Sequence, residues 1–262
     1  QDGRIKTVST TGQEVELRIS TMPTAFGEKL VMRIFTPEVL VRDFVELGFT
    51  ADDRVRWESM IKEPNGIILV SGPTGSGKTT TLYSSLKQLA TPEVNVCTIE
   101  DPIEMIEPAF NQMQVQPVIG VDFATGVRTL MRQDPDIIMV GEIRDRDTAD
   151  MAVQAALTGH LVLSSLHTND APTAVTRLLD LGVPSYLIQS TVLGVMAQRL
   201  VRTLCPHCKK PTEPPDDETW RAITAPWRAD KPEQVMGAVG CLECRMTGYF
   251  GRVGLYEIMT MT

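Results

Sequence analysis

The chain has 262 residues, enough for one large domain or for one domain with small satellites. Lysine and arginine total 25 and aspartate and glutamate total 33, so the formal net charge is −8. This acidic balance argues against nucleic-acid binding, which usually leaves a basic footprint. No apolar run approaches the roughly 18 residues of a membrane-spanning helix, and no charged-then-apolar leader begins the sequence. The chain starts at Gln1 without Met, and we expect it to be a fragment of a longer protein.

Residues 1–36 are predicted to form strands. In residues 14–20, apolar and charged side chains alternate as on a strand with one buried face, and residues 28–35 alternate less regularly. The residues between them have the proline and glycine of a loop. Arg18 and Arg33 lie on the polar faces of the two strands, at mirrored distances from this loop, and exposed strand arginines are most often only solvated. The segment is too short to hold a core, so we expect the remnant of a truncated domain.

Residues 66–204 are predicted to form the main α/β domain, a parallel sheet covered by helices. Short apolar runs alternate there with helix-period segments. These helical segments are residues 123–133, 147–157, 171–181 and 184–200. In sheets of this class, ligands bind at the carboxyl ends of the strands. Residues 37–65, which precede the sheet in the sequence, are predicted to be a linker with helices. One of these helices begins after the N-cap residue Thr50.

A complete phosphate-loop pattern, G-x-x-x-x-G-K-[ST], lies between a predicted buried strand and a predicted helix. The glycines let backbone N–H groups turn toward a polyphosphate, and the helix N-terminus adds the positive end of its dipole. Lys78 can reach the β- and γ-phosphates, and the Thr79 hydroxyl can bind Mg²⁺. A glycine-rich turn before an ordinary helix is the alternative, which the complete pattern disfavours. The residues predicted to bind ATP are Gly72, Thr74, Gly75, Ser76, Gly77, Lys78, Thr79 and Thr80.

Two carboxylates follow predicted strands. Glu142 follows the apolar strand 137–140 as in a Walker B strand, where a carboxylate can hold Mg²⁺ directly or through water, although any buried strand that ends in an acid looks similar. Glu100 ends the strand 95–100 and is the first of three carboxylates in five positions. Phosphoanhydride hydrolysis needs a group that orients and deprotonates water, and Glu100 is the predicted base. The alternative is that these acids cap the next element or bind a partner.

Two of the three histidines bracket one predicted strand, residues 161–165. His160 precedes this strand and His167 follows it. A histidine at a strand end can hydrogen-bond a γ-phosphate or report its presence, whereas a lone histidine is more often structural. Both interpretations stay open on the residues alone.

Four of the five cysteines form two C-x-x-C pairs that frame the proline-rich segment 205–248. They can supply four thiolates to a tetrahedral Zn²⁺, and a segment whose prolines break regular elements needs such a metal staple. The alternatives are free thiols or a redox pair, and His207 could replace one thiolate. Cys97 lies in a predicted buried strand and is expected to be inert, and residues 249–262 begin a C-terminal segment with a strand. The predicted zinc ligands are Cys205, Cys208, Cys241 and Cys244.

These motifs in this order resemble one family over nearly the whole chain: the secretion-superfamily ATPases that drive type II secretion and type IV pilus assembly. Residues 98–104 resemble the aspartate box of that family, with Glu100 in the place of its catalytic glutamate. Residues 130–145 resemble its Walker B box, and residues 158–169 resemble its histidine box. The resemblance implies a RecA-like ATPase core with a small partial N-terminal domain and a tetracysteine zinc insert.

The resemblance also implies roles for the ends of the chain. Residues 1–36 are similar to the end of the second N-terminal domain of the family, and Arg18 and Arg33 fall where the family places arginines that approach the γ-phosphate. An arginine-finger role would follow, on a small domain that moves with nucleotide state. The tetracysteine segment resembles the zinc insert of secretion and pilus-extension members, which retraction members lack. The resemblance further implies that the first N-terminal domain of the family would precede the residues of this sequence.

The family forms hexamers on the cytoplasmic face of the inner membrane, docked to a membrane platform protein. The resemblance therefore implies a homohexameric motor, peripheral at that membrane, with ATP, Mg²⁺ and Zn²⁺ as cofactors and no nucleic acid as partner. One alternative is a RecA-like nucleic-acid translocase, which the acidic charge and the lack of a basic, aromatic-rich groove disfavour. The other is a non-catalytic zinc adaptor in which a bound nucleotide has only a structural role. Glu100 and Glu142 argue against the adaptor. Pilus assembly and type II secretion share every motif described above.

Overall fold

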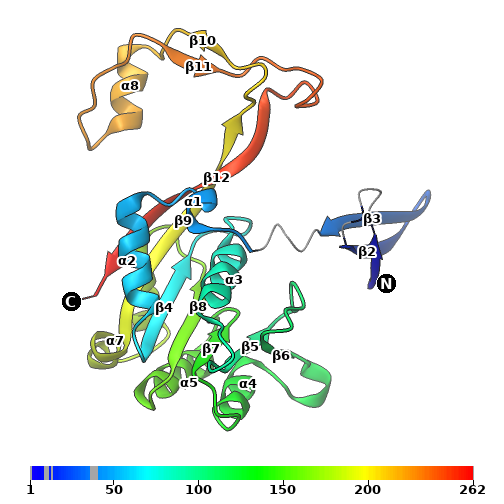
Figure 1. Cartoon of the computed structure of the whole chain (residues 1–262), viewed down its shortest axis with the longest axis vertical. Helices are drawn as coiled ribbons and strands as arrows, with labels where there is room; N and C mark the ends of the chain where they lie inside the picture. The colour runs from blue at the N-terminus through cyan, green and yellow to red at the C-terminus, as the bar shows by residue number, and fades with distance from the viewer. Residues whose placement is uncertain (1, 9–11, 13, 36–40, 262) are drawn as a thin grey trace. The chain divides into compact units, whose positions relative to one another are not determined.

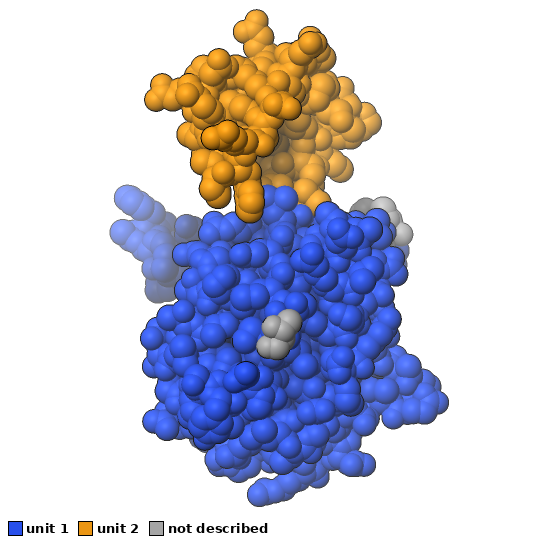
Figure 2. All heavy atoms as spheres, turned by 90° about the vertical axis from the view of Figure 1, so that its left-hand side faces the viewer, with its two compact units in different colours: residues 1–199, 254–262 blue, residues 200–253 orange. Residues whose placement is uncertain are grey.

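The computed structural model describes residues 2–8, 12, 14–35 and 41–261 (Figure 1). These residues fall into two compact units, one of residues 1–199 and 254–262 and one of residues 200–253 (Figure 2). Residue 36 of the predicted N-terminal segment and residues 37–40 of the predicted linker lie outside the described residues. None of the helices in the described ranges combines the length and apolar character that a bilayer crossing requires.

Strands and helices alternate along most of the chain (Figure 1). The strands are β1 (Asp2–Val8), β2 (Glu14–Thr24), β3 (Gly27–Phe35), β4 (Gly66–Ser71), β5 (Val96–Glu100), β6 (Asn111–Gln114), β7 (Ile137–Val140), β8 (Leu161–Leu166), β9 (Val192–Leu204), β10 (Lys210–Thr212), β11 (Val235–Gly237) and β12 (Tyr249–Thr260). The helices are α1 (Phe44–Leu47), α2 (Ala51–Ile61), α3 (Lys78–Leu89), the 3₁₀ turn η2 (Pro117–Ile119), α4 (Phe123–Leu130), α5 (Arg146–Leu157), α6 (Ala171–Asp180), α7 (Ser185–Thr191) and α8 (Asp217–Thr224).

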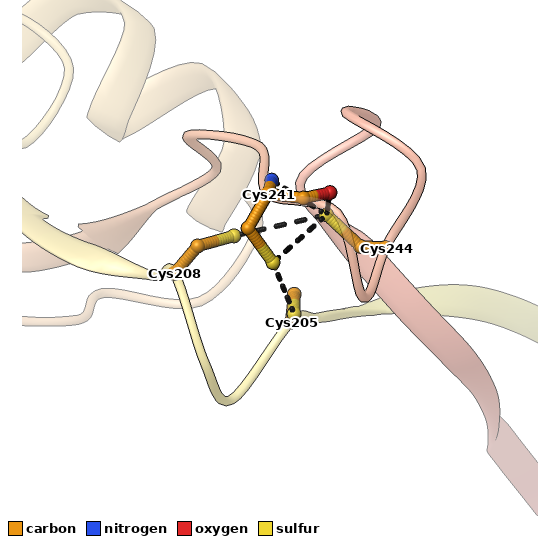
Figure 3. A group of neighbouring side chains, drawn as sticks. All are labelled: Cys205, Cys208, Cys241 and Cys244. Atoms are coloured by element: carbon orange, nitrogen blue, oxygen red, sulfur yellow. Dashed lines mark hydrogen bonds between the residues drawn. The ribbon is translucent and has the colours of Figure 1, made fainter.

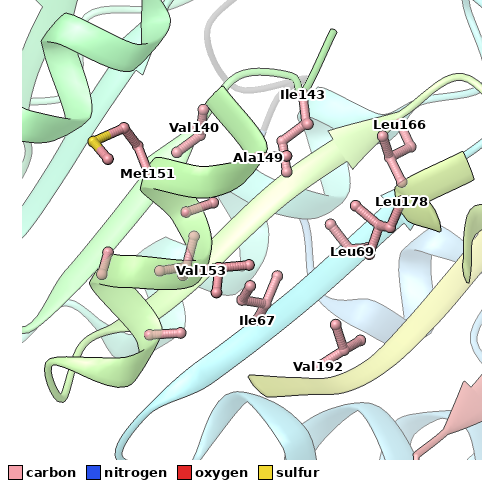
Figure 4. Close-up of a cluster of buried hydrophobic side chains, with 14 of the residues drawn as sticks. Ile67, Leu69, Val140, Ile143, Ala149, Met151, Val153, Leu166, Leu178 and Val192 are labelled. Atoms are coloured by element: carbon pink, nitrogen blue, oxygen red, sulfur yellow. The ribbon is translucent and has the colours of Figure 1, made fainter. Parts of the chain in front are cut away.

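A seven-stranded sheet in the order β12-β9-β4-β8-β7-β5-β6 forms the centre of the larger unit. Each neighbouring pair from β9 to β6 is parallel. On β4, Ile67 and Leu69 join one hydrophobic cluster, shown in part in Figure 4, while Ile68 and Val70 join a second cluster. Successive residues of a strand point to opposite faces, so the sheet has a core on each side. The predicted α/β fold with a parallel sheet is confirmed.

The prediction of one helix over residues 184–200 is wrong in its second half. The helix α7 ends at Thr191, and the chain continues as β9, which pairs in parallel with β4. Val195 and Met196 are both buried, as expected for a strand covered on both faces. A continuous apolar run of this kind cannot be told from a buried helix by its periodicity, and here the pairing with β4 decides.

The N-terminal strands form a separate antiparallel sheet in the order β1-β2-β3. Its register pairs Arg18 with Arg33, as their mirrored positions predict, and pairs Thr24 with Gly27. The predicted loop between the two strands is therefore shorter than expected, because Ala25 and Phe26 alone make the turn. Two-residue turns of this kind are the commonest hairpin connections.

The smaller unit contains short regular elements in spite of its prolines. Strands β10 and β11 form an antiparallel pair, and Asp216 caps helix α8 by accepting a hydrogen bond from the backbone N–H of Thr219. The expectation that prolines would break every regular element is therefore wrong. The prolines at 214, 215, 226 and 232 lie in the loops around α8, where they do not remove a helix hydrogen bond.

Truncation of a core strand should destabilise the larger unit. Ile138 is fully buried in β7, and we expect Ile138→Ala to lower the free energy of unfolding by about 2–5 kcal/mol, because the lost contacts leave a cavity. The matched control is Ile106→Ala, since Ile106 is 60% exposed and its truncation should stay within about 0.5 kcal/mol. Urea unfolding followed by circular dichroism measures both values. Equal effects of the two variants would contradict the assigned core.

Candidate functional site

Four parallel strands bring their carboxyl ends to one edge of the central sheet. The register pairs Ser71 with Leu166, Val140 with Ser164 and Ile99 with Val140. The residues that follow these strand ends are therefore neighbours in space. They are the phosphate loop after β4, Glu100 at the end of β5, Glu142 after β7 and His167 after β8.

The phosphate loop wraps tightly between β4 and α3. Gly72 has φ +144°, and a Cβ at this position would lie 2.4 Å from the carbonyl oxygen of Gln198, so only glycine fits. The Lys78 ammonium donates to the carbonyl oxygens of Gly72 at 2.8 Å and Pro73 at 3.3 Å. Burial lowers the pKa of Lys78, and the negative charge of Glu142 opposes that shift. A partly buried cation at this point suits a polyphosphate.

A hydrogen bond from Gln198 holds the phosphate loop, and two buried serine hydroxyls near the loop have no partner among the described residues. The Gln198 amide donates to the carbonyl oxygen of Ser76 at 2.7 Å and accepts from the Thr81 hydroxyl at 2.8 Å. Within the described part of the chain, the buried hydroxyl oxygens of Ser71 and Ser76 have no partner. Helix α3 begins at Lys78, and its N-cap residue Gly77 provides no side-chain cap. Free N–H groups and unpaired hydroxyls at a helix N-terminus fit the phosphates of ATP.

Glu100, the predicted base, is buried in a network of neutral donors. Its Oε2 accepts from the Tyr83 hydroxyl at 2.6 Å, and its Oε1 accepts from the Thr98 hydroxyl at 2.6 Å and the Gln112 amide at 3.2 Å. The side chain is 3% exposed. The carboxylate is thus held in one orientation at the same strand edge as the phosphate loop.

Glu142 forms an ion pair with Arg144 and a contact with His167 at the end of β7. Its Oε1 lies 2.5 Å from the Arg144 guanidinium and its Oε2 lies 3.3 Å from His167 Nε2, while Arg144 also lies 3.6 Å from Asp101. Burial would raise the pKa of Glu142, but its hydrogen bond to Arg144 and the charges of Arg144 and His167 outweigh burial and lower the pKa. The carboxylate and the Thr79 hydroxyl are the kind of oxygen ligands that Mg²⁺ takes.

His160 and His167 lie at opposite ends of β8. His160 precedes the strand, its carbonyl oxygen accepts from the N–H of Gly66, and its ring nitrogen Nδ1 lies 2.9 Å from the carbonyl oxygen of Ala155. The phosphate loop begins at the other end of β4, six residues after Gly66, which corresponds to roughly 20 Å of strand. His160 is therefore too distant to contact a phosphate at the loop of its own chain, and we retain only His167 in that role.

Arg18 reaches the acidic segment that follows Glu100. Its guanidinium donates to the carbonyl oxygens of Ile103 at 3.2 Å and Glu104 at 2.7 Å, and it forms an ion pair with the Glu104 carboxylate at 2.7 Å. Arg33 lies opposite Arg18 in the register, and both arginines line a pocket of about 630 Å³. Ile103 and Glu104, which Arg18 contacts, belong to residues 98–104, the segment that resembles the aspartate box.

The four paired cysteines form one cluster in the smaller unit (Figure 3). The sulfur atoms of Cys205 and Cys241 lie 3.9 Å apart, those of Cys208 and Cys244 lie 3.8 Å apart, and those of Cys241 and Cys244 lie 3.7 Å apart. Four sulfurs around zinc, each about 2.3 Å from the metal, are separated by about 3.8 Å in a tetrahedron. The cluster therefore has the dimensions of a Cys₄ zinc site.

The surroundings of the cluster act in opposite directions on two of its thiols. Burial raises the pKa of Cys208 to about 11. Burial would raise the pKa of the Cys244 thiol, but backbone N–H groups of Cys241 and Gly248 donate to its sulfur and lower the pKa to about 6. Thiolates are the form that binds zinc. Among the described residues, the cluster of possible ligands contains these cysteines and not His207. His207 is not needed as a ligand, because four sulfurs already fill the tetrahedron.

Several residues of the site carry no recognisable sequence pattern. Tyr83 and Gln112 hold Glu100, and Gln198 with Thr81 holds the phosphate loop. Gln112 belongs to β6, a short polar strand that periodicity does not reveal. Gln198 belongs to the segment predicted to be helical, so its place beside the loop could not be inferred.

Loss of one cluster thiol should abolish zinc binding. We expect the purified wild-type chain to contain about one zinc ion, and Cys244→Ser to contain far less, because a structural zinc site needs all four ligands. Cys97→Ser is the matched control, since Cys97 is buried in β5 away from the cluster and should leave the zinc content unchanged. Inductively coupled plasma mass spectrometry measures the metal. Full zinc occupancy in Cys244→Ser would refute the site.

A family model described as type II/IV secretion system protein matches residues 1–262. The type IV pilus assembly ATPase TfpB of Acinetobacter baylyi is 66% identical over 261 residues, which cover 100% of this chain and 44% of that protein. The type II secretion system ATPase E of Vibrio cholerae is 50% identical over 259 residues, which cover 99% of this chain and 51% of that protein. The chain thus spans about half the length of these relatives.

Two solved structures also match this chain. The pilus retraction motor PilT with bound ADP matches with a TM-score of 0.63 and 29% identity, over 78% of this chain and 60% of that chain. The Legionella pneumophila ATPase DotB matches in fold, with a TM-score of 0.68 at 23% identity, over 100% of this chain and 63% of that chain. On its sequence motifs, its fold and the match over its full length, the chain belongs to the family of type II/IV secretion system proteins.

Proposed function

We propose that this chain is the ATP-hydrolysing part of a motor that drives type IV pilus assembly or type II secretion. The observation that carries the proposal is the shared sheet edge, where the phosphate loop, the buried Glu100 and the Glu142–His167 pair meet. The names of the relatives support it, since TfpB is a type IV pilus assembly ATPase and the Vibrio protein is a type II secretion system ATPase. The acidic charge of −8 disfavours the alternative of a nucleic-acid translocase.

The residues of the site divide the work of hydrolysis. Lys78 and the backbone N–H groups of the loop bind the phosphates, and Thr79 with Glu142 would hold Mg²⁺, which when bound neutralises charge on the phosphate oxygens. Glu100 orients a water molecule and accepts its proton at a carboxylate oxygen. His167 lies beside Glu142 at 3.3 Å and would respond to the γ-phosphate.

Two further contributions concern the N-terminal sheet and the cysteine cluster. Arg18 and Arg33 would act as arginine fingers, so that nucleotide state moves the N-terminal sheet and produces mechanical work. Zinc at the cysteine cluster would hold together a unit in which the cysteines themselves form the buried cluster. In this proposal the working protein is a homohexamer that acts on the cytoplasmic face of the inner membrane with a platform protein.

Replacement of Glu100, the proposed base, should lower the rate of ATP hydrolysis and leave ATP binding intact. We expect Glu100→Gln to bind ATP with unchanged affinity and to lose at least about 100-fold in kcat, because a general base contributes about 10²–10⁴ in rate. Glu46→Gln is the control, since Glu46 is an exposed glutamate on α1 and its replacement should leave kcat unchanged. Phosphate release with Mg²⁺ and equilibrium ATP binding measure the two quantities. Wild-type turnover by Glu100→Gln would remove Glu100 from this role.

Replacement of Lys78 in the phosphate loop should affect ATP binding as well as turnover, unlike replacement of Glu100. Lys78→Ala should lose both ATP binding and turnover, because the ammonium contacts the phosphates in the ground state as well as in the transition state. The same two assays compare it with Glu100→Gln. Wild-type ATP affinity in Lys78→Ala would contradict the assigned phosphate site.

A further inference from the structure

Glu100 is held by side chains from three different elements. The hydroxyl of Tyr83 comes from α3, the hydroxyl of Thr98 comes from β5 itself, and the amide of Gln112 comes from β6. The backbone N–H of Glu104 adds a longer contact of 3.5 Å to Oε2. An ionised carboxylate offers about four acceptor sites on its two oxygens. The orientation of Glu100 therefore depends on groups well outside its own strand.

Tyr83 has a single hydroxyl proton to donate. The hydroxyl lies 2.6 Å from Glu100 Oε2 and 3.1 Å from the carbonyl oxygen of Met105, and it accepts from the Gln112 amide at 3.0 Å. A hydrogen bond to a carboxylate is shorter and stronger than one to a carbonyl, so the proton is directed at Glu100. Burial and the negative charge of Glu100 raise the pKa of Tyr83, which keeps the phenol protonated and a donor.

The place of Tyr83 on its helix connects it to the phosphate loop. Tyr83 is fully buried five positions after Lys78, in the same 12-residue helix α3. The helix that presents the lysine and its free N–H groups to phosphate thus also places the hydroxyl that holds the base. The Gln112 amide lies 3.0 Å from the Tyr83 hydroxyl, 3.2 Å from Glu100 and 2.9 Å from the carbonyl oxygen of Met105. Its two N–H groups are therefore shared among three acceptors, two of which belong to this arrangement.

We propose that Tyr83 and Gln112 are positioning residues for hydrolysis, which fix the Glu100 carboxylate in the orientation from which it accepts a proton from water. The inference rests on the proposed ATPase function and on Glu100 as the base. Neither side chain need touch the nucleotide. Their effect is on the fraction of time that the carboxylate faces the attacking water, so it is confined to turnover.

The test replaces the hydroxyl and keeps the ring. In the full chain, Tyr83→Phe should lower kcat about 10- to 100-fold, as expected for a misplaced catalytic group, with ATP affinity unchanged. Gln112→Met should lower kcat in the same direction without loss of affinity. Tyr186→Phe is the matched control, because Tyr186 is 68% exposed and its hydroxyl should not affect kcat. The assays are phosphate release with Mg²⁺ and equilibrium ATP binding.

A double-mutant cycle distinguishes positioning from simple structural support. In a Glu100→Gln background, Tyr83→Phe should lower the single-turnover rate no further, because residues that act through one group are not additive. An equal loss in both backgrounds, a loss of ATP affinity in Tyr83→Phe, or wild-type kcat in both Tyr83→Phe and Gln112→Met would overturn the inference. An inactive wild-type chain would overturn the proposed function as well, so the two failures are distinguishable.

Discussion

The parallel register of the central strands is the constraint on which the site depends. Because β4, β8, β7 and β5 run in the same direction and are buried on both faces, their carboxyl ends are fixed at one edge to within a residue. A slip of one residue would turn every buried side chain of a strand to the other face. The packing of the two cores therefore sets the distances between the phosphate loop, Glu100 and Glu142, which are far apart in the sequence.

Much of this arrangement could be predicted from short patterns whose chemistry is local. The phosphate loop and the paired cysteines are recognisable because backbone approach and metal geometry demand particular residues at particular spacings. Tyr83, Gln112 and Gln198 could not be found in this way, because each acts across the fold on a group more than ten residues distant in the chain. Only the tertiary structure brings such residues to their partners.

The two main errors of prediction have distinct physical causes. The strand β9 was mistaken for helix because its first half, residues 192–198, is almost entirely buried and shows no alternation of polar and apolar residues. His160 was grouped with His167 because both adjoin β8, although strand direction places the first at the amino end and the second at the carboxyl end. Direction along the sheet, rather than nearness in sequence, determines which residues can share a phosphate site.

The smaller unit departs from the sheet along β9 and the chain returns along β12, and these two strands are neighbours in the sheet. The ends of the 200–253 segment therefore join the core at adjacent positions. An insertion between neighbouring strands changes the entropy of loop closure only slowly as it grows, and it leaves the pairing of the core strands intact. The length of the cysteine-containing segment is therefore largely independent of the strands that carry the phosphate loop and Glu100.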